Sequence, residues 1–398
     1  MTLLKNKKGG ERLVGIIAVV TIAIAWFLGA KITNGAVEQY LAVALPQAGH
    51  FENIGEGTFA AYQDDSLQQL IGYVSVGEAT GYGGPMKVAV ATDLEGNVLG
   101  LAVMEHKETP AWYDRVAGSD FIESLVGKNY QEGFVIGEDV DGVTGATYTS
   151  RAIANAALQA SREVAGIQLG LPVAEETPPR IQFGFPEITL IGLFVVGYIG
   201  HRKKFKYTKQ LRWISMIVGL VVLGFIYTRP LTLSDVSKFL MGFWPQWQTN
   251  LYWYLLMGGI LFVFTVDNKN PYCEWFCPFG AAQECMGAIG GARTVSPGRF
   301  KNFLKWLPRG LAWLALVLAF LFRNPGLTSY EVFGTFFDLN GNTLQFALLI
   351  IILVVSLFVR RPWCHYLCPL RPVTDFYRSL RNWIIESWKT VRKNQNVQ

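Results

Sequence analysis

The stretch 251-LYWYLLMGGILFVFTVDNKNPYCEWFCP-278 couples a long apolar run to a pair of cysteines. Leu251–Val266 contains no charged side chain, and Pro271-Tyr-Cys273-Glu-Trp-Phe-Cys277-Pro278 follows shortly after it. A second copy occurs further along, where Leu344–Val359 leads into Pro362-Trp-Cys364-His-Tyr-Leu-Cys368-Pro369. An internal repeat of an apolar run followed by Pro-aromatic-Cys-x-x-x-Cys-Pro predicts two equivalent membrane hairpins, whose thiols share one purpose.

The amino-acid composition is that of a membrane protein. Hydrophobic residues make up 51% of the chain and charged residues 16%, which is too apolar for an ordinary soluble enzyme. Most of the apolar runs reach the thickness of a bilayer once their flanking residues are included. Ile188–Gly200 and Leu311–Phe322 are short, so a tilted or interfacial segment is the alternative for each. We expect a multi-pass α-helical membrane protein of about six spans, formed by Leu13–Ala30, Ile188–Gly200, Trp213–Tyr227, Leu251–Val266, Leu311–Phe322 and Leu344–Val359.

Basic residues are concentrated at alternate ends of these runs. The N-terminus, the segment 201–212, the loop 293–301 and the tail from Arg360 are rich in Lys and Arg, whereas the loops 230–250 and 324–342 carry very few. Because basic loops stay in the cytoplasm, we expect both termini and both cysteine pairs on the cytoplasmic side of the cell (inner) membrane. The net charge of +5 is explained by this topology, so nucleic-acid binding is not expected.

The apolar runs and the charge pattern divide the chain into five parts. Leu13–Ala30 is expected to remain as an anchor rather than be removed as a signal peptide, because Leu28-Gly29-Ala30 is a poor cleavage site. The expected parts are an N-terminal membrane anchor at 1–33, an exported α+β domain at 34–172, a linker at 173–185, a five-span membrane domain with both cysteine pairs at 186–372, and a basic cytoplasmic tail at 373–398.

The exported segment shows the patterns of an α+β domain. Alternation of apolar and polar residues predicts three strands, at Leu70–Val76, Lys87–Thr92 and Val98–Glu105, with a turn at Asp93-Leu-Glu-Gly96-Asn97 between the last two. Helical spacing predicts an Ala-rich helix at Thr149–Ala165 and a short helix at Ser119–Val126 with Ser119 as its N-cap.

The motif Asp141-Gly-Val-Thr144-Gly145-Ala146-Thr147 lies directly before the Ala-rich helix. Gly145 permits a tight turn with positive φ. Thr147 is expected at or near the helix N-cap, where free N–H groups and the helix dipole favour an anion. The alternative is that Thr147 or Thr149 is an ordinary helix cap, and the local pattern alone does not decide between the two.

This motif is similar to the Asp-x-x-[Ser/Thr]-Gly-Ala-Thr signature of the FMN-binding domains in the NqrC, RnfG and NosR families. Two upstream stretches, Gly81-Tyr-Gly83-Gly84-Pro85 and Glu105-His106-Lys-Glu108-Thr109-Pro110, resemble the Gly-Tyr-Gly-Gly and His-x-Glu-Thr-Pro stretches of the same families. The family often continues with Gly, whereas Ala111-Trp112-Tyr113 follows here, so Trp112 or Tyr113 is the candidate for stacking on a flavin ring.

The resemblance implies that Thr147 carries FMN through a phosphoester, installed by a flavin transferase. An exported flavin has no cytoplasmic pool to rebind from, so covalent attachment would prevent its loss. The remaining FMN-binding residues that the resemblance implies are Asp141, Thr144, Gly145, Ala146, Glu108, Thr109, Gly83 and Gly84.

The two cysteine pairs together supply four thiolates. Cys273, Cys277, Cys364 and Cys368 are enough for one [2Fe–2S] or [4Fe–4S] cluster, while structural zinc and a thiol–disulfide relay are the alternatives. Structural disulfides are not expected in the cytoplasm. We favour a shared redox metal site, because a redox cofactor elsewhere in the chain makes one more plausible than zinc.

Three other features narrow the choice of cofactor. Cys285 lies outside the repeat and is expected to be a small buried residue. His365 has no counterpart in the first pair and is expected to be a bystander. A haem held by two histidines within the bilayer is not expected, because none of the four histidines, His50, His106, His201 and His365, lies within an apolar run.

The membrane half resembles the NapH, NosR and NirI group, so the chain is identified as a member of the NosR/NirI-type membrane FMN-binding family. Members such as NosR continue into a ferredoxin domain, which is expected to be absent here because no cysteine follows Cys368. The overall pattern is similar to the short flavoproteins of reductive dehalogenase operons.

The expected function is that of an electron-transfer component rather than a stand-alone enzyme. Electrons from a quinol or a cytoplasmic donor would pass the cysteine centre, reach FMN on Thr147 and leave to an exported reductase or its membrane anchor. The resemblance points to a reductive dehalogenase or another respiratory reductase. The alternative is a maturation or regulatory membrane protein that supports assembly of a partner metalloenzyme. Lipid and a quinone are the other expected partners.

Overall fold

The computed structural model describes residues 7–32, 37–55, 57–64, 69–174, 180–202, 206–295 and 298–395. The chain forms two compact units. Residues 175–179 of the expected linker, 1–6 of the anchor and 396–398 of the tail lie outside the described residues. The first unit comprises Met1–Pro178, Ser234–Pro245 and Ala315–Ser329, and the second comprises Pro179–Leu233, Gln246–Leu314 and Tyr330–Gln398.

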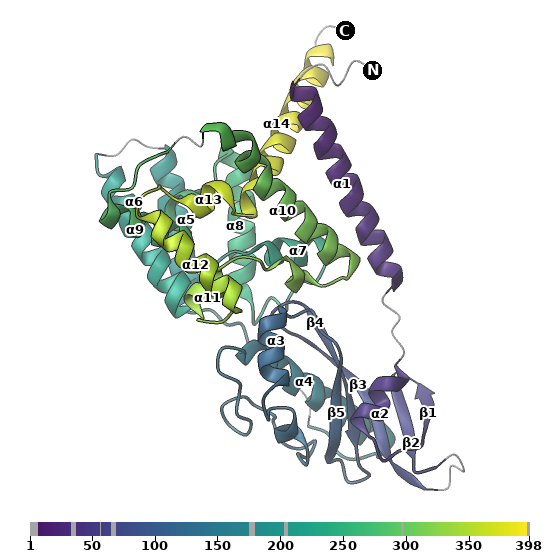
Figure 1. The fold of residues 1–398 in the computed structure, drawn as a ribbon. Helices are drawn as coiled ribbons and strands as arrows, with labels where there is room; N and C mark the ends of the chain where they lie inside the picture. Colours follow the sequence, from purple (N-terminus) through teal and green to yellow (C-terminus); the bar gives the residue numbers. More distant parts are fainter. Residues whose placement is uncertain are drawn as a thin grey trace. The chain divides into compact units, whose positions relative to one another are not determined.

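The first unit contains a five-stranded antiparallel sheet, in which each strand pairs with the next along the chain (Figure 1). The three predicted strands correspond to β3, β4 and β5. Sequence reasoning missed the two strands at the other edge, and the first of these is mostly exposed and lacks a buried alternating face. The strands are β1 (His50–Gly55), β2 (Thr58–Tyr62), β3 (Leu70–Thr80), β4 (Pro85–Thr92) and β5 (Val98–Glu105).

The turn between β4 and β5 has the predicted location. The N–H of Asp93 donates to the carbonyl of Asn97 at 2.9 Å, and the Asp93 carboxylate accepts from the N–H groups of Glu95 and Asn97 at 3.0 and 2.7 Å. Gly96 takes φ +85°, a conformation that glycine adopts without steric cost. This turn fixes the register of the central hairpin.

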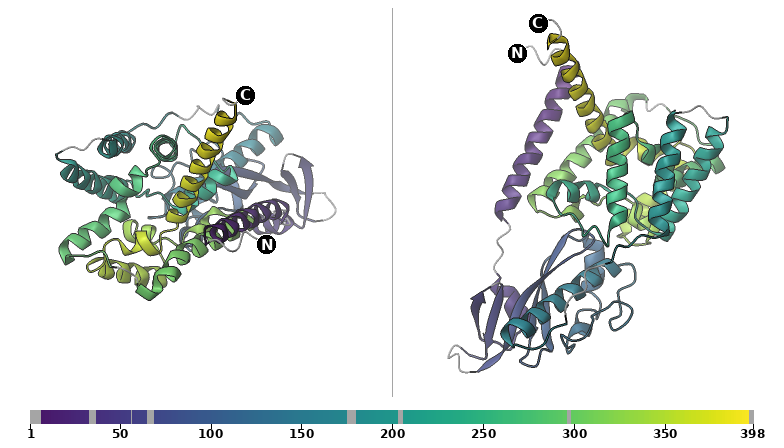
Figure 2. Two further views of the ribbon diagram at one scale, coloured as in Figure 1. Left: turned by 90° about the horizontal axis from the view of Figure 1, so that it is seen from above. Right: turned by 180° about the vertical axis from the view of Figure 1, so that it is seen from behind.

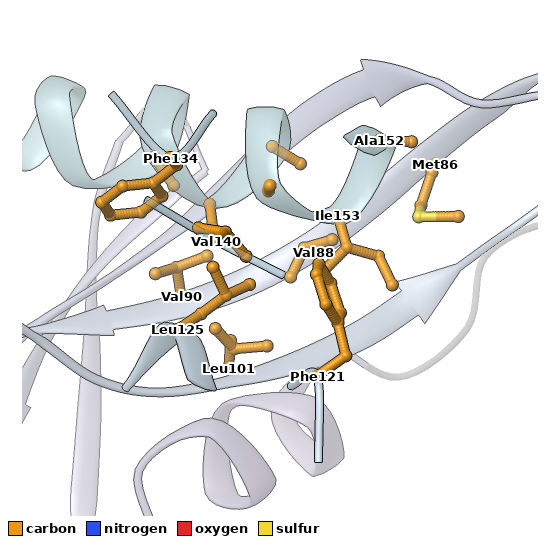
Figure 3. Packing of buried hydrophobic residues seen from close by; sticks show 14 of the residues in the cluster. Met86, Val88, Val90, Leu101, Phe121, Leu125, Phe134, Val140, Ala152 and Ile153 are labelled. Atoms are coloured by element: carbon orange, nitrogen blue, oxygen red, sulfur yellow. The ribbon is translucent and has the colours of Figure 1, made fainter. Parts of the chain in front are cut away.

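Alternating residues of β4 face two different layers of helix. Val88 and Val90 pack with Ile153 of α4 (Thr147–Glu163), as Figure 3 shows. Ala89 and Ala91 instead pack with residues of α2 (Glu38–Ala44) on the opposite face, because successive strand side chains point to opposite sides. The sheet is therefore buried on both faces by helix.

The Ala-rich composition of α4 lets it approach the sheet closely. A Cβ atom at Gly77 of β3 would overlap the carbonyl oxygen of Ala156. The helix confirms the prediction for Thr149–Ala165, although it begins two residues earlier and ends in a π-turn, η2 (Val164–Gln168). The predicted helix at Ser119–Val126 is wrong in extent, since only the 3₁₀ turn η1 (Glu123–Leu125) forms there.

Four further elements belong to the first unit. One precedes the domain as a long apolar helix, and one follows β5 with Pro110 at its first position, where a missing N–H costs no hydrogen bond. They are α1 (Lys7–Ile32), α3 (Pro110–Ala117), α7 (Leu233–Met241, of which Leu233 is in the second unit) and η6 (Pro325–Thr328).

The second unit is helical. Its helix α5 packs against α6 and α8, and Figure 2 shows the three as neighbouring helices. The helix α10 (Lys301–Leu321) is shared between the two units. The helical elements of the second unit are α5 (Phe185–Arg202), α6 (Thr208–Val218), η3 (Gly219–Ile226), α8 (Leu251–Asp267), η4 (Tyr272–Phe276), α9 (Pro278–Gly290), η5 (Gly298–Phe300), α11 (Phe333–Phe337), α12 (Thr343–Ser356), α13 (Pro362–Tyr366) and α14 (Leu370–Gln395).

Within the described ranges, three helical segments are long and apolar enough to cross a membrane. They are Leu13–Ala30, Thr208–Ile226 and Gly298–Leu321. Shorter apolar helices cover Phe185–Gly200, Leu251–Asp267 and Thr343–Ser356. All six predicted apolar runs therefore lie mainly in helices, and the count of about six spans stays a prediction.

Candidate functional site

The predicted anion-binding motif forms the start of α4. Ala146 is the N-cap and Thr147 is the first helical residue, so the expected cap position was one residue too late. Gly145 takes φ +78°, as its place in the turn predicts. The methyl group of Ala146 cannot accept a hydrogen bond, so the N-cap side chain leaves the first-turn N–H groups to another acceptor. Those groups and the helix dipole suit a phosphate.

The two threonines of this first turn have different environments. Thr147 is exposed, whereas Thr149 is 2% exposed. The hydroxyl of Thr149 donates to the carboxylate of Glu108 at 2.7 Å. Only Thr147 therefore presents an accessible hydroxyl beside the first-turn N–H groups, and the alternative assignment to Thr149 loses its basis.

Glu108 ties the glycine-rich loop to α4. Its side chain is fully buried, and its carboxylate also accepts from the N–H of Gly83 at 2.9 Å. Burial raises the pKa of Glu108, against the hydrogen bonds from Gly83 and Thr149 and the charge of Lys238. A Cβ atom at Gly83 would overlap the carbonyl oxygen of Lys107, so only glycine fits there. Glu108 thus holds the loop and helix in one arrangement.

Of the other predicted FMN-binding residues, two lie near this carboxylate and two on the motif loop. Gly84 has φ +150° in the glycine-rich loop, and the hydroxyl of Thr109 donates to that of Ser329 at 3.3 Å. On the motif loop, Asp141 is exposed and the carbonyl of Thr144 accepts from Arg115 at 3.1 Å. The structure therefore links Gly83, Glu108 and the start of α4 directly, and the motif loop through α3.

Aromatic side chains gather beside the same loop. Tyr82 packs edge-on against Trp112 with ring centres 5.2 Å apart, and against Tyr148 at 6.4 Å. Tyr113 is stacked on His106 with ring centres 3.7 Å apart, which occupies one of its faces. Sequence reasoning singled out Trp112 and Tyr113 but missed Tyr82 and Tyr148, although each of these adjoins a quoted motif residue. A helix N-terminus next to exposed aromatic surface fits FMN, with its phosphate and planar ring.

An ion pair on α7 contacts this glycine-rich loop from outside the α+β domain. Lys238 lies 3.0 Å from Asp235, and both side chains are buried. The Lys238 ammonium donates to the carbonyl of Tyr82 at 2.9 Å and lies 4.5 Å from the centre of its ring. Sequence reasoning missed this pair. The available signal was a lysine in a loop that otherwise carries very few basic residues.

The four repeated cysteines come together in the second unit. Cys273 lies in η4 and Cys364 in α13, while Cys277 and Cys368 directly precede the next helices. Desolvation raises the pKa of Cys277 to about 11, and the neighbouring Cys364 adds to the rise. Desolvation likewise raises the pKa of Cys368, and Cys364, Cys273 and Cys277 all contribute. Each thiol pair is thus close enough to feel the other.

Two amide side chains donate to these sulfur atoms. Asn270 Nδ2 lies 3.0 Å from Cys273 Sγ, and Gln283 Nε2 lies 3.3 Å from Cys364 Sγ. In the part of the chain that the structure describes, no three His, Cys, Asp or Glu side chains already stand in metal-binding positions. Four soft thiols with N–H···S hydrogen bonds nevertheless match the donor set of an iron–sulfur cluster. Both amides were missed by sequence reasoning.

Two residues near the cysteines were expected to be bystanders. Cys285 is partly exposed rather than buried, because it lies beyond the buried first half of α9. His365 is half-buried, and burial together with the charge of Arg371 lowers its pKa. Its role as a bystander stays a prediction.

Comparison with known proteins places both sites in recognised domains. Residues 81–162 match the FMN-binding domain family, and residues 249–296 and 342–386 match the 4Fe-4S binding domain family. The first match contains Glu108 and Thr147, and the second contains all four repeated cysteines. The chain therefore combines an FMN-binding domain with a repeated 4Fe-4S binding domain.

Three curated relatives cover different parts of the chain. Protein NirI of Paracoccus denitrificans is 29% identical over 202 residues, which is 45% of this chain and 29% of NirI. Regulatory protein NosR of Pseudomonas aeruginosa is 28% identical over 180 residues, 41% of this chain and 24% of NosR. The G protein of the ion-translocating oxidoreductase complex of Stutzerimonas stutzeri is 31% identical over 166 residues, 35% of this chain and 73% of that relative.

The chain thus spans less than a third of NirI and of NosR, but most of the Stutzerimonas relative. The FMN-binding domain match and the apolar helices agree with a flavoprotein at a membrane. On these grounds the chain belongs to the NosR/NirI-type family of membrane FMN-binding proteins.

Proposed function

We propose that this protein is a membrane electron-transfer flavoprotein, which passes electrons between a four-cysteine iron–sulfur centre and an FMN esterified to Thr147. The observation that carries the proposal is the exposed Thr147 hydroxyl on the first turn of α4, where the N-cap side chain cannot use the first-turn N–H groups. Thr149 is engaged by Glu108 and does not compete for the same modification.

The residues around Thr147 have separate tasks in this proposal. The first-turn N–H groups of α4 would hold the phosphate of the ester, and Gly145 gives the motif loop its tight turn. Glu108 fixes the glycine-rich loop, which places Tyr82 against Trp112. Bound FMN takes up two electrons and releases them singly. The aromatic side chains would cover part of its ring and exclude water.

The cysteines of the second unit would hold the other redox centre. Cys273, Cys277, Cys364 and Cys368 would each supply a thiolate, and an iron–sulfur cluster exchanges single electrons. Gln283 and Asn270 donate hydrogen bonds to two of these sulfur atoms, which stabilises their negative charge. A centre of this kind suits exchange with a flavin that takes part in both one- and two-electron steps.

The direction of electron flow and the partners are also proposed. A quinol or cytoplasmic donor would reduce the cysteine centre on the cytoplasmic face, and FMN would pass the electrons to an exported reductase. The positive-inside pattern supports this topology. Likeness to reductive dehalogenase-associated flavoproteins suggests that class of acceptor. The Stutzerimonas relative belongs by name to an oxidoreductase complex, which supports an assembly with other membrane proteins.

A direct test uses the purified full chain from cells that contain the flavin transferase. The wild type and Thr147→Ser are expected to keep a fluorescent flavin through denaturing electrophoresis, whereas Thr147→Ala loses it. Iron and acid-labile sulfide are expected in the wild type and absent from Cys364→Ala. A fluorescent Thr147→Ala protein, or zinc in place of iron, would refute the assignment of the corresponding centre.

A maturation or regulatory role is the second candidate, because one relative is named a regulatory protein. In that case the protein would supply electrons only while a partner metalloenzyme is assembled. Cells that lack this protein separate the two roles. A fully loaded partner enzyme that lacks only its electron supply supports respiration, whereas a partner without its cofactor supports maturation.

A further inference from the structure

A buried carboxylate near the cysteines is surrounded by three guanidinium groups. Glu284 on α9 lies 2.9 Å from Arg212, 3.1 Å from Arg360 and 2.9 Å from Arg361, and its own side chain is only 6% exposed. Burial opposes its ionisation, but the hydrogen bond from Arg212 and the three positive charges outweigh burial and lower the pKa of Glu284. One carboxylate balances one guanidinium, so three positive charges and one negative charge leave a formal excess of +2.

One of the three arginines places its charge next to the thiols. Arg361 Nη1 donates to the carbonyl oxygen of Cys273 at 3.0 Å. A Cβ atom at Gly280 would lie 3.7 Å from the central carbon of the Arg361 guanidinium and 3.5 Å from Cys277 Cβ. The side chain of Arg361 is 12% exposed, so water screens its charge poorly. Arg361 is therefore a poorly screened cation beside the first cysteine pair.

The backbone at Arg361 is strained. Its φ of +50° and ψ of +56° lie in the left-handed region, which a residue with a Cβ atom rarely adopts. Pro362 follows and disfavours helical conformations at the residue before it. Glycine would take this conformation without steric cost. Strain at a non-glycine position persists when the side chain is required, and here that side chain contacts Glu284 and the backbone of Cys273.

A simpler interpretation is that Arg361 only ties neighbouring segments together. It bridges α9 and η4, and its Nη2 also lies 3.2 Å from Met216 Sδ on α6. A purely structural tie would not require a net positive charge at this point. Arg360 offers a natural comparison, because it contacts the same Glu284 oxygen but its side chain is 49% exposed.

We propose that Arg361 is a positioning residue that raises the reduction potential of the centre held by Cys273, Cys277, Cys364 and Cys368. Uptake of one electron from a donor adds one negative charge to that centre and removes one from the donor. A fixed cation a few ångströms away stabilises the reduced form more than the oxidised form. This inference rests on the proposed iron–sulfur centre and adds the residue that sets its potential.

The test is a redox titration of the purified full-length protein, followed by the electron paramagnetic resonance signal of the reduced centre. Arg361→Gln and Arg361→Gly are each expected to lower the ratio of reduced to oxidised centre at least tenfold at a fixed potential, which is about 59 mV for a one-electron couple. Arg361→Lys keeps the charge and is expected to restore most of the ratio. Arg360→Gln is the matched control and should change the ratio less than threefold.

The Gly and Gln variants separate charge from architecture. Arg361→Gly relieves the backbone strain while removing the cation, so a folded, iron-containing protein with a lowered potential supports the inference even where Arg361→Gln is unstable. A potential unchanged in both variants would overturn it, as would a shift in Arg361→Lys as large as that in Arg361→Gln. Wild-type protein without iron and sulfide would instead refute the proposed centre, and this inference with it.

Discussion

The glycine-rich loop with α4 and the cysteine centre solve the problem of holding a redox group in different ways. The first uses backbone: a helix N-terminus, Gly83 pressed against a carbonyl, and one buried carboxylate. The second uses side chains: four thiols, two amides and an excess of guanidinium groups around Glu284. Backbone sites tolerate little change in shape, whereas side-chain sites can be retuned one charge at a time.

Removal of Lys238 is expected to have the largest effect on the backbone-built site. Lys238→Met removes the cation that pairs with buried Asp235 and holds the carbonyl of Tyr82, at a cost of about 3 kcal/mol. Faster proteolysis between residues 81 and 84 would be the readout. The double variant Asp235→Asn, Lys238→Met should recover part of the loss. Equal damage in the single and double variants would contradict this account of the ion pair.

Gly83→Ala tests shape directly and is expected to cost about 2 kcal/mol, because the added methyl group overlaps the carbonyl of Lys107. Flavin content after purification should fall severalfold while the iron content stays the same. Gly258→Ala is the matched control, since nothing lies within 4 Å of a Cβ atom there. If Gly83→Ala retained full flavin content, the backbone-built description of this site would be wrong.

Glu108→Gln is expected to change the pH dependence of stability more than stability itself. Burial raises the pKa of Glu108 above its ordinary value of 4.5, so the folded state binds a proton more tightly than the unfolded state does. Its contribution to stability is therefore greatest at low pH and declines as pH rises from about 4.5 through the folded-state pKa. The variant cannot titrate at this position. Thermal unfolding from about pH 4.5 to about pH 8 should show a shallower decline than in the wild type.

Asn270→Ala is expected to give the smallest effect, and at the other site. It removes one N–H···S hydrogen bond to Cys273, worth about 1 kcal/mol. The reduction potential of the cysteine centre should fall by less than in Arg361→Gln, with flavin content unchanged. A shift larger than that of Arg361→Gln would mean that hydrogen bonds, not charge, dominate this centre.

Sequence reasoning succeeded where local pattern determines structure. β4, the Asp93 turn and β5 follow from alternation and turn residues, and α4 follows from helical spacing. The exposed edge strand β1 carries no such pattern. Ala146 rather than Thr147 became the N-cap, because the turn at Gly145 completes one residue earlier than the capping preference of threonine suggests.

The candidate sites divide in the same way. The cysteine repeat was visible in the sequence, and so were the glycines and Glu108 through family resemblance. The contact from Lys238 to Tyr82 joins residues 156 positions apart, and no periodic pattern reports such a pair. The left-handed backbone at Arg361 was equally hidden, since an Arg-Pro dipeptide ordinarily indicates extended chain.

The exposed position of Thr147 on a rigid helix has a consequence for how a flavin would meet its partners. A group joined there by one flexible ester can swing but not diffuse away, so its local concentration stays near the millimolar values typical of short tethers. Tight noncovalent binding is then unnecessary in either redox state. The ring contacts are free to loosen when an acceptor arrives, and a reversible encounter would not lead to loss of the cofactor.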